Sequence, residues 1–213
     1  MELTEKMQQK LNDGREYRSM TLENADDGYL VKGYATTFNQ PYHLYNRADG
    51  KEVREMVDAN AFANTDMSDV IMQYDHEGRV FARLSNNTLS LETDEHGLMV
   101  RADLGGTEIG RNLYEEIKGG YTNKMSFGFT VKDASVEPDG DGYLRTIRSI
   151  GKLYDVSAVS LPANDYTEIS ARSHCDGEIT EIEAELLRAE EEARKLAEQK
   201  EILTNRLKAL RKD

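Results

Sequence analysis

Short runs of alternating apolar and polar residues, separated by turn-forming residues, occupy the chain from Tyr29 to Arg172. The Leu-Ser-Leu-Glu run at residues 89–92 is one example. Because successive side chains of a strand point to opposite faces, a period of two predicts strands that each place one face on a core. The predicted strands are residues 29–37, 69–74, 80–84, 88–93, 98–104, 124–132, 143–149 and 152–160.

Turns and two short helices complete this pattern. The segments 94–97 and 139–142 have the composition of hairpin tips, and short helices are predicted near residues 58–63 and over 107–118. Many short strands with few helices predict a mainly β, α+β fold, either a barrel or a sandwich. The acidic loop at 133–142 is compatible with a flexible lid or with a plain hairpin.

The period changes beyond Gly177, where apolar residues recur at alternating steps of three and four. The recurring positions are Ile179, Ile182, Leu186, Ala189, Ala193, Leu196, Lys200, Leu203, Leu207 and Leu210. This spacing is the heptad seam of a coiled coil, and Lys200 is its charged member. We predict a C-terminal coiled-coil helix for oligomerisation or scaffold docking; the alternative is a helix that packs back on its own domain.

These patterns divide the chain into three parts: a polar N-terminal arm (1–28), a β-rich domain (29–172) and the helical tail (173–213). The arm is polar and ends in a turn composition, so it is predicted to be a short helix or a loosely held segment.

Composition narrows the partners and the compartment. The net charge is −13, which disfavours binding to nucleic acid or to anionic membranes and makes a protein partner the better expectation. Cys175 is the single cysteine of the sequence, which fits a reducing compartment. The N-terminus contains no signal-like apolar run, and no stretch approaches the ~20 apolar residues of a membrane span. We expect a soluble, cytoplasmic protein.

Three segments on predicted strands supply a histidine, a hydroxyl and a carboxylate. They are Tyr-Asp-His at 74–76, Met-Ser-Phe-Gly-Phe at 125–129 and Leu-Tyr-Asp-Val-Ser at 153–157. A serine hydroxyl is a poor nucleophile unless an imidazole accepts its proton, and a third group must fix the tautomer of that imidazole. The candidate residues for acyl transfer are therefore His76, Ser126 and Asp155.

Each candidate also has a plainer explanation. Ser126 is expected on the small polar face of its strand, where Gly128 leaves open space for a substrate, although an ordinary solvent-facing serine fits equally. His76 ends an apolar strand beside a glycine turn, and could be a surface histidine. Asp155 lies between apolar neighbours and needs a partner if it is buried, either His76 or a structural salt bridge.

Other motifs are weaker. His96 lies in a hairpin tip, His43 in a tyrosine-rich loop, and His174 beside Cys175 in a linker that gives the two no rigid frame. The glycine-rich segment 105–112 lacks the lysine and hydroxyl of a phosphate loop, and segment 137–148 lacks the last ligand of a calcium loop. No zinc motif is present, so neither a metal nor a cofactor is expected.

The local sequence resembles the caudate-phage prohead maturation proteases of the Hong Kong 97 type. The resemblance runs in order from about residue 29 to 172, with two departures: Asn60 where glycine is expected, and Asp155 where the family often has glutamate. The matching segments are Gly-Tyr-Ala at 33–35 with Phe38, residues 55–62, residues 74–76, residues 88–91, Gly97-Leu98, residues 125–129, residues 154–159 and Pro-Ala-Asn at 162–164.

The resemblance implies a fold similar to that of the herpesvirus assembly proteases, a small closed β-barrel with peripheral helices. It also implies a serine endopeptidase in which Ser126 is the nucleophile, His76 the general base and Asp155 the residue that orients His76. Such enzymes act inside the prohead, in the host cell cytoplasm, on the major capsid protein or the scaffold protein, and often on themselves. The C-terminal helix would then carry the protease into the shell or join it to a second copy.

Two non-enzymatic readings remain open from the sequence. One is a capsid assembly scaffold that associates through its tail and uses the barrel to bind capsid. The other is an unrelated β-barrel binding module with a coiled-coil dimeriser. Convergence of Ser126, His76 and Asp155 in space would favour the enzyme over both.

Overall fold

The structure is a computed structural model that describes residues 5–24, 28–160 and 164–210. The chain divides into two compact units, residues 1–173 and 174–213. The three-part division expected from the sequence stays a prediction.

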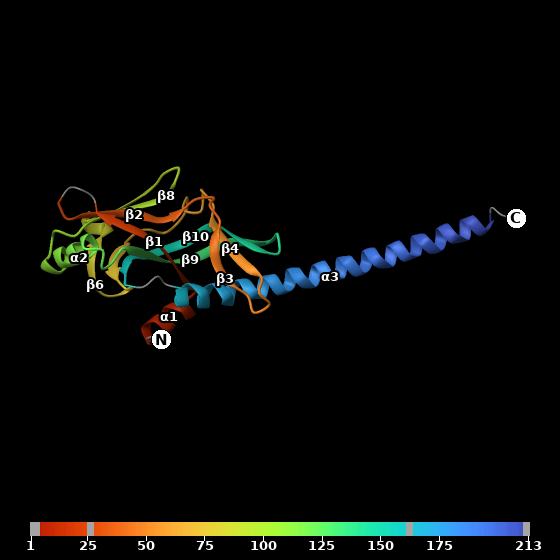
Figure 1. Cartoon of the computed structure of the whole chain (residues 1–213). Helices are drawn as coiled ribbons and strands as arrows, with labels where there is room; N and C mark the ends of the chain where they lie inside the picture. Colours follow the sequence, from red (N-terminus) through yellow and green to blue (C-terminus); the bar gives the residue numbers. More distant parts are fainter. Residues whose placement is uncertain (1–4, 25–27, 161–163, 211–213) are drawn as a thin grey trace. The chain divides into compact units, whose positions relative to one another are not determined.

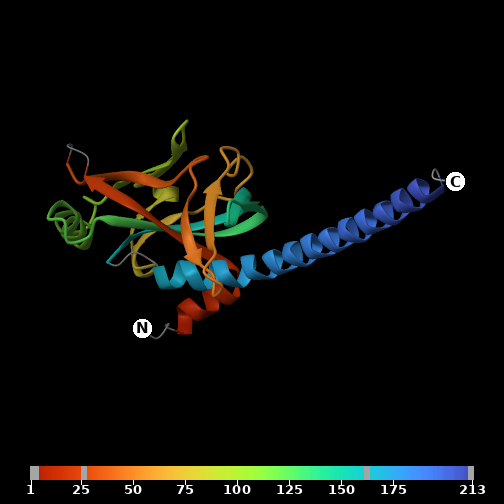
Figure 2. The same cartoon turned by 45° about the vertical axis from the view of Figure 1, so that its right-hand side comes forward.

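The first unit is dominated by one sheet of ten strands, with two short helices, α1 (Glu5–Asn12) and α2 (Glu108–Lys118), and a single 3₁₀ turn (Leu84–Asn86) in its described part. The strands are β1 (Arg15–Asn24), β2 (Leu30–Thr37), β3 (Tyr42–Asn46), β4 (Glu52–Val57), β5 (Ile71–Tyr74), β6 (Glu77–Arg83), β7 (Leu89–Thr93), β8 (Gly97–Asp103), β9 (Lys124–Asp139) and β10 (Gly142–Val159). The last helix, α3 (Asn164–Leu210), is continuous over 47 residues (Figure 2).

The strand order is β3-β4-β10-β9-β1-β2-β8-β7, with β5 beside β10 and β6 beside β5. Figure 1 labels the helices and most of these strands. One edge of β10 pairs with β9 in an antiparallel ladder. The other edge pairs in parallel with β4 near Tyr143–Ile147 and with β5 near Asp155–Ala158. The β5–β6 hairpin is therefore held beside the C-terminal half of β10.

The predicted closed barrel is wrong, whereas the mainly β, α+β class is confirmed. Among the described strands, no ladder joins the two ends of the sheet, β3 and β7. An isolated bridge between Phe38 and Val57 brings the end of β2 to the end of β4, but a barrel needs a continuous ladder between every pair of neighbours. The sheet is open.

The predicted strands are present, with shifts at their ends, except that the two predicted strands 143–149 and 152–160 are one continuous strand, β10. The hairpin interpretation of residues 133–142 is the one the structure bears out, because β9 and β10 pair up to a tight turn at Gly140, where φ is +59°. The helix over 107–118 is confirmed as α2, whose N-cap Thr107 accepts a hydrogen bond from the Gly110 amide. Residues 59–64 form turns instead of the helix expected near 58–63. The C-terminal helix begins at Asn164, earlier than predicted, and its coiled coil stays a prediction.

Three strands were not predicted: β1, β3 and β4. The most important is β1, because it lies in the middle of the sheet between β9 and β2. Its sequence looks like a surface segment, yet Glu16 and Arg18 are buried.

Glu16, Arg18, Glu55 and Arg145 form a buried cluster of two carboxylates and two guanidinium groups. Arg18 donates to both oxygens of Glu55 at 2.5 and 2.7 Å and to Glu16 at 2.7 Å. Arg145 donates to both oxygens of Glu16 at 2.6 and 2.8 Å and to Glu55 at 2.8 Å. Burial alone would raise the pKa of Glu16, but the two arginines lower it to about 2. The cluster therefore joins β1 to β4 and β10, and its two carboxylate charges balance its two guanidinium charges.

The apolar core lies on one face of β9 and β10, and the site described below lies on the other. Met125, Phe127 and Phe129 of β9 and Val156 and Ala158 of β10 are fully buried in this core. Within the described residues, no helix combines the length and the apolar character needed to cross a bilayer.

Candidate active site

His76 occupies a two-residue turn between β5 and β6. Asp75 and His76 both have positive φ, 48° and 60°, and Tyr74 pairs with Glu77 across the turn. This is the geometry of a type I′ hairpin, which costs non-glycine residues about 1 kcal/mol or more each. The predicted position of His76 at a strand end is confirmed, but the turn itself is Asp75-His76 instead of the glycine turn expected after it.

Contacts to the end of β10 hold this turn in place. The Asp75 amide donates to the Ala158 carbonyl at 2.9 Å, and the Asp75 carboxylate accepts from the amide and the hydroxyl of Ser160, both at 2.9 Å. These bonds offset the cost of the left-handed backbone and fix the direction of the His76 side chain.

His76 and Asp155 form a buried pair. Nδ1 of His76 lies 2.5 Å from Oδ1 of Asp155, and each residue is 2% exposed. The same carboxylate oxygen accepts a hydrogen bond from the Ser157 hydroxyl at 2.8 Å. Burial alone would raise the pKa of Asp155, but the charge and hydrogen bond of His76, the Ser157 hydroxyl and the charge of Lys10 together lower it. An ionised Asp155 keeps the proton on Nδ1 and leaves Nε2 as the acceptor.

Ser126 lies on the same face of the sheet as Asp155. In the β9–β10 ladder Ser126 is opposite Ser157, and Gly128 is opposite Asp155. Residues opposite each other share a face, so Ser126, Ser157 and Asp155 lie together. Ser126 is fully buried, and neither its Oγ nor Nε2 of His76 has a hydrogen-bond partner among the described residues. The three candidate residues therefore lie on one face of the sheet. The hydrogen bond between His76 and Asp155 is formed, and the hydrogen bond between Ser126 and His76 is not.

The space beside Gly128 is filled, contrary to the expectation of an opening for substrate. A Cβ at Gly128 would lie 2.8 Å from Oδ2 of Asp155 and 2.8 Å from Cε1 of Tyr17. The Tyr17 ring in turn meets the His76 ring edge-on, with centroids 4.4 Å apart. The missing side chain at Gly128 thus makes room for the Asp155 carboxylate and for the ring that flanks the imidazole.

Lys10 of α1 contacts the same turn from outside the sheet. Its ammonium donates to the His76 carbonyl at 2.5 Å. Sequence reasoning missed Lys10, Tyr17 and Ser157. The serine could have been found from its place two residues after Asp155, whereas Tyr17 and Lys10 carry no local signal.

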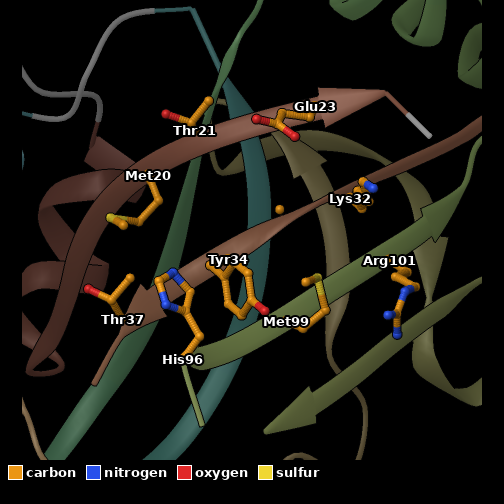
Figure 3. Close-up of a pocket in the computed structure, with 10 residues that line it drawn as sticks. Met20, Thr21, Glu23, Lys32, Tyr34, Thr37, His96, Met99 and Arg101 are labelled. Atoms are coloured by element: carbon orange, nitrogen blue, oxygen red, sulfur yellow. The ribbon is translucent and has the colours of Figure 1, made fainter. Parts of the chain in front are cut away.

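The remaining sequence candidates do not join this site. His43 is exposed on β3, and the side chain of His174 lies outside the described ones. His96 lines a pocket of about 420 Å³ over β1, β2 and β8, where its ring packs against Tyr34 (Figure 3). None of the three candidate residues lines that pocket. Within the described part of the chain, no three His, Cys, Asp or Glu side chains converge as metal ligands would.

Comparison with known proteins identifies the family of the chain. Residues 15–180 match the family described as caudovirus prohead serine protease. The chain belongs to this family. It is also 30% identical over 151 residues to the prohead protease of Enterobacteria phage HK97. The alignment covers 70% of this chain and 62% of that relative, so the chain spans less than two thirds of the relative's length. No solved structure matches.

The family match begins at β1, so α1 with Lys10 precedes it, and it ends within α3 at residue 180. The three candidate residues, together with Tyr17 and Ser157, all fall inside the match. Most of the helical tail falls outside it.

Proposed function

We propose that this protein is a serine endopeptidase of phage prohead maturation, with Ser126, His76 and Asp155 as its catalytic residues. The observation that carries the proposal is the buried 2.5 Å pair of His76 and Asp155 on the face of the sheet that holds Ser126. Family membership supports the same reaction class.

The proposed reaction follows from the orientation of the imidazole. Nε2 of His76 accepts the proton of the Ser126 hydroxyl while Oγ attacks the carbonyl carbon of the scissile peptide bond. Asp155 stabilises the imidazolium that forms. His76 then gives the proton to the leaving amine, and the acyl-enzyme on Ser126 is hydrolysed by a water molecule that His76 deprotonates.

One further step is required before this chemistry. In the described conformation Ser126 is fully buried and does not bond His76. Substrate binding must therefore uncover the serine and close the gap to Nε2, as catalytic hydrogen bonds often tighten only in the substrate complex.

The proposed substrates are segments of the major capsid protein or of the scaffold protein, and ends of this chain itself. The proposed place of action is the interior of the prohead in the host cytoplasm. The exposed helix α3 is proposed to join two copies of the chain, with Leu186, Leu196 and Leu203 at 50, 52 and 58% exposure. Neither nucleic acid nor a membrane is proposed as a partner.

The test is co-expression with the major capsid protein, followed by intact-mass analysis. The wild type should give defined truncation products, and Ser126→Ala should give none. Ser157→Ala is the matched control, because Ser157 lies opposite Ser126 on the same face and should keep cleavage at a reduced rate.

Two outcomes would overturn the assignment. Cleavage that survives Ser126→Ala but stops with Ser157→Ala would show that the nucleophile is Ser157 on β10 and not Ser126 on β9. Identical masses for wild type and both variants, with shells still assembling, would leave a non-catalytic scaffold.

A further inference from the structure

The exposed part of α3 carries three leucines of the predicted heptad seam. The seam residues Leu186, Leu196 and Leu203 are each at least half exposed over a helix that extends to Leu210. Rows of leucines at heptad spacing are buried in coiled coils. Ile179 is fully buried, so the exposed seam begins beyond it. From Leu186 to Leu210 the helix rises about 36 Å at 1.5 Å per residue, which is long enough for a stable seam.

We propose that two copies of the chain pair through α3 in an antiparallel coiled coil, with Leu186 of one copy opposite Leu203 of the other. This deepens the self-association proposed above and does not depend on the peptidase activity. Three features of the helix select the antiparallel orientation.

The first feature is the polarity of the helix. Residues 178–193 contain seven glutamates and one arginine, whereas residues 194–210 contain five basic and two acidic residues. A parallel pair places like charge against like charge along its whole length. An antiparallel pair places the acidic half of one helix against the basic half of the other, which favours association.

The second feature is the layers of the seam. With Ile179 at heptad position a, Lys200 is also at a and Ala189 is at d. A parallel pair stacks a on a and d on d, so Lys200 would meet Lys200 of the second copy inside the seam. In the antiparallel pair each a layer meets a d layer, and Lys200 lies opposite Ala189, where the small side chain leaves room for the lysine stem to reach water.

The third feature is the flanking residues at positions e and g, which set orientation in coiled coils. In a parallel pair Glu178 would face Glu183 of the second copy, and Glu185 would face Glu190. In the antiparallel pair Glu183 faces Thr204, Glu190 faces Ala197 and Glu192 faces Gln199. The antiparallel arrangement therefore removes four carboxylate–carboxylate contacts from each dimer.

Charge exchange in one layer tests both the partner and its direction. Leu186→Glu and Leu203→Lys, each alone in the full-length chain, should weaken dimerisation at least a hundredfold, measured by sedimentation across a concentration series. The double variant should regain most of the lost affinity, because each antiparallel layer then pairs Glu with Lys. In a parallel dimer it would pair Glu with Glu and Lys with Lys, and a double variant weaker than both singles would overturn the proposal.

A matched control separates the seam from general effects on the helix. Leu187 is 67% exposed and lies outside the seam, so Leu187→Glu should leave dimerisation within about twofold of wild type. A wild-type chain that stays monomeric over the whole concentration series would also overturn the proposal, even if the chain binds scaffold helices instead.

Spin labels give an independent measure of direction. With Cys175 replaced by Ser, single cysteines at Ala184 and Glu198 occupy the same outer heptad position. In the antiparallel dimer the two labels are offset along the axis by about 31 Å for residue 184 and about 10 Å for residue 198, from the rise of 1.5 Å per residue. Equal distances at the two sites would show a parallel pair. Peptidase activity of the same variants is measured alongside, so that a failed dimer and a failed enzyme are told apart.

Discussion

Substitution of Gly128 by alanine should disable the proposed active site without unfolding the sheet. The new Cβ would lie 2.8 Å from Oδ2 of Asp155 and 2.8 Å from Cε1 of Tyr17, well inside ordinary contact distance. Tyr17 is fully buried and Asp155 nearly so, and the hydrogen bonds from His76 and Ser157 hold the carboxylate in place. The carboxylate must therefore move by several tenths of an ångström, and its bond to His76 must be distorted.

The size of the effect follows from overpacking and from misplacement. Extra methyl groups in packed interiors cost about 1–3 kcal/mol, and in a chain of this size each kcal/mol lowers Tm by about 2–4 °C. A Tm lower by about 2–12 °C is therefore expected. A displacement of about 1 Å in a catalytic group can cost about 100-fold in rate. We expect kcat for a capsid-derived peptide to fall by about 100-fold with KM little changed.

Calorimetry and steady-state kinetics on the same samples measure both effects. Gly106→Ala is the matched control, since Gly106 is exposed and a Cβ there meets no atom within 4 Å. A normal kcat together with a lowered Tm would show that the position of Asp155 does not govern catalysis. A normal kcat with an unchanged Tm would show that the packing around Gly128 is looser than described.

Three further predictions concern neighbouring residues. Ser157→Ala removes one hydrogen bond to the Asp155 carboxylate, worth about 1.5–3 kcal/mol, and should lower kcat about 10-fold while keeping the bond between His76 and Asp155 visible by NMR. Lys10→Gln removes the bond to the His76 carbonyl, so kcat should fall about 3- to 10-fold and the amides of residues 75–77 should exchange faster with solvent; Lys132→Gln, an exposed site on β9, should change neither. Acid should destabilise the fold through Glu16, because its pKa is lowered from 4.5 to about 2 in the folded chain. A carboxyl group with a lowered pKa stabilises the fold at pH values above its unfolded pKa, so about 3 kcal/mol of the free energy of unfolding should be lost between pH 4.5 and pH 2. The measurement is the urea midpoint as a function of pH for wild type and for Glu16→Gln. Equal pH dependence of the midpoint in the two proteins would contradict this prediction.

The alternating strands were predictable because their apolar faces are continuous. The run Met125, Phe127 and Phe129 shows its core face in the sequence, and β9 lies where that run predicts. β1 could not be found in this way. Glu16 and Arg18 are buried. The partner of Arg18, Glu55, lies 37 residues away along the chain, and the partner of Glu16, Arg145, lies 129 residues away. A strand whose buried face is charged has the composition of a surface segment until its distant partners are known.

The candidate site was predictable in part for a related reason. His76, Ser126 and Asp155 each stand out in a short local motif, and the histidine–carboxylate contact agrees with the suggestion that a buried Asp155 needs a partner. Their catalytic roles stay a prediction that the proposed experiments test. Tyr17 enters the site only through the register of β1 on β9, where it lies opposite Gly128. No pattern within the sequence specifies that register, so neither the ring beside His76 nor the filled space at Gly128 could be anticipated.

The parallel pairing of β5 with β10 has a consequence for timing during synthesis. His76 leaves the ribosome 79 residues before Asp155. At about 5–20 residues per second this delay is about 4–16 s. The two side chains meet only after β5 docks along β10, a long-range pairing that forms late because of its loop-closure entropy. A nascent or partly folded chain therefore lacks the contact between His76 and Asp155. Under the proposed mechanism we expect no peptidase activity from such a chain until its last strand, β10, is in place.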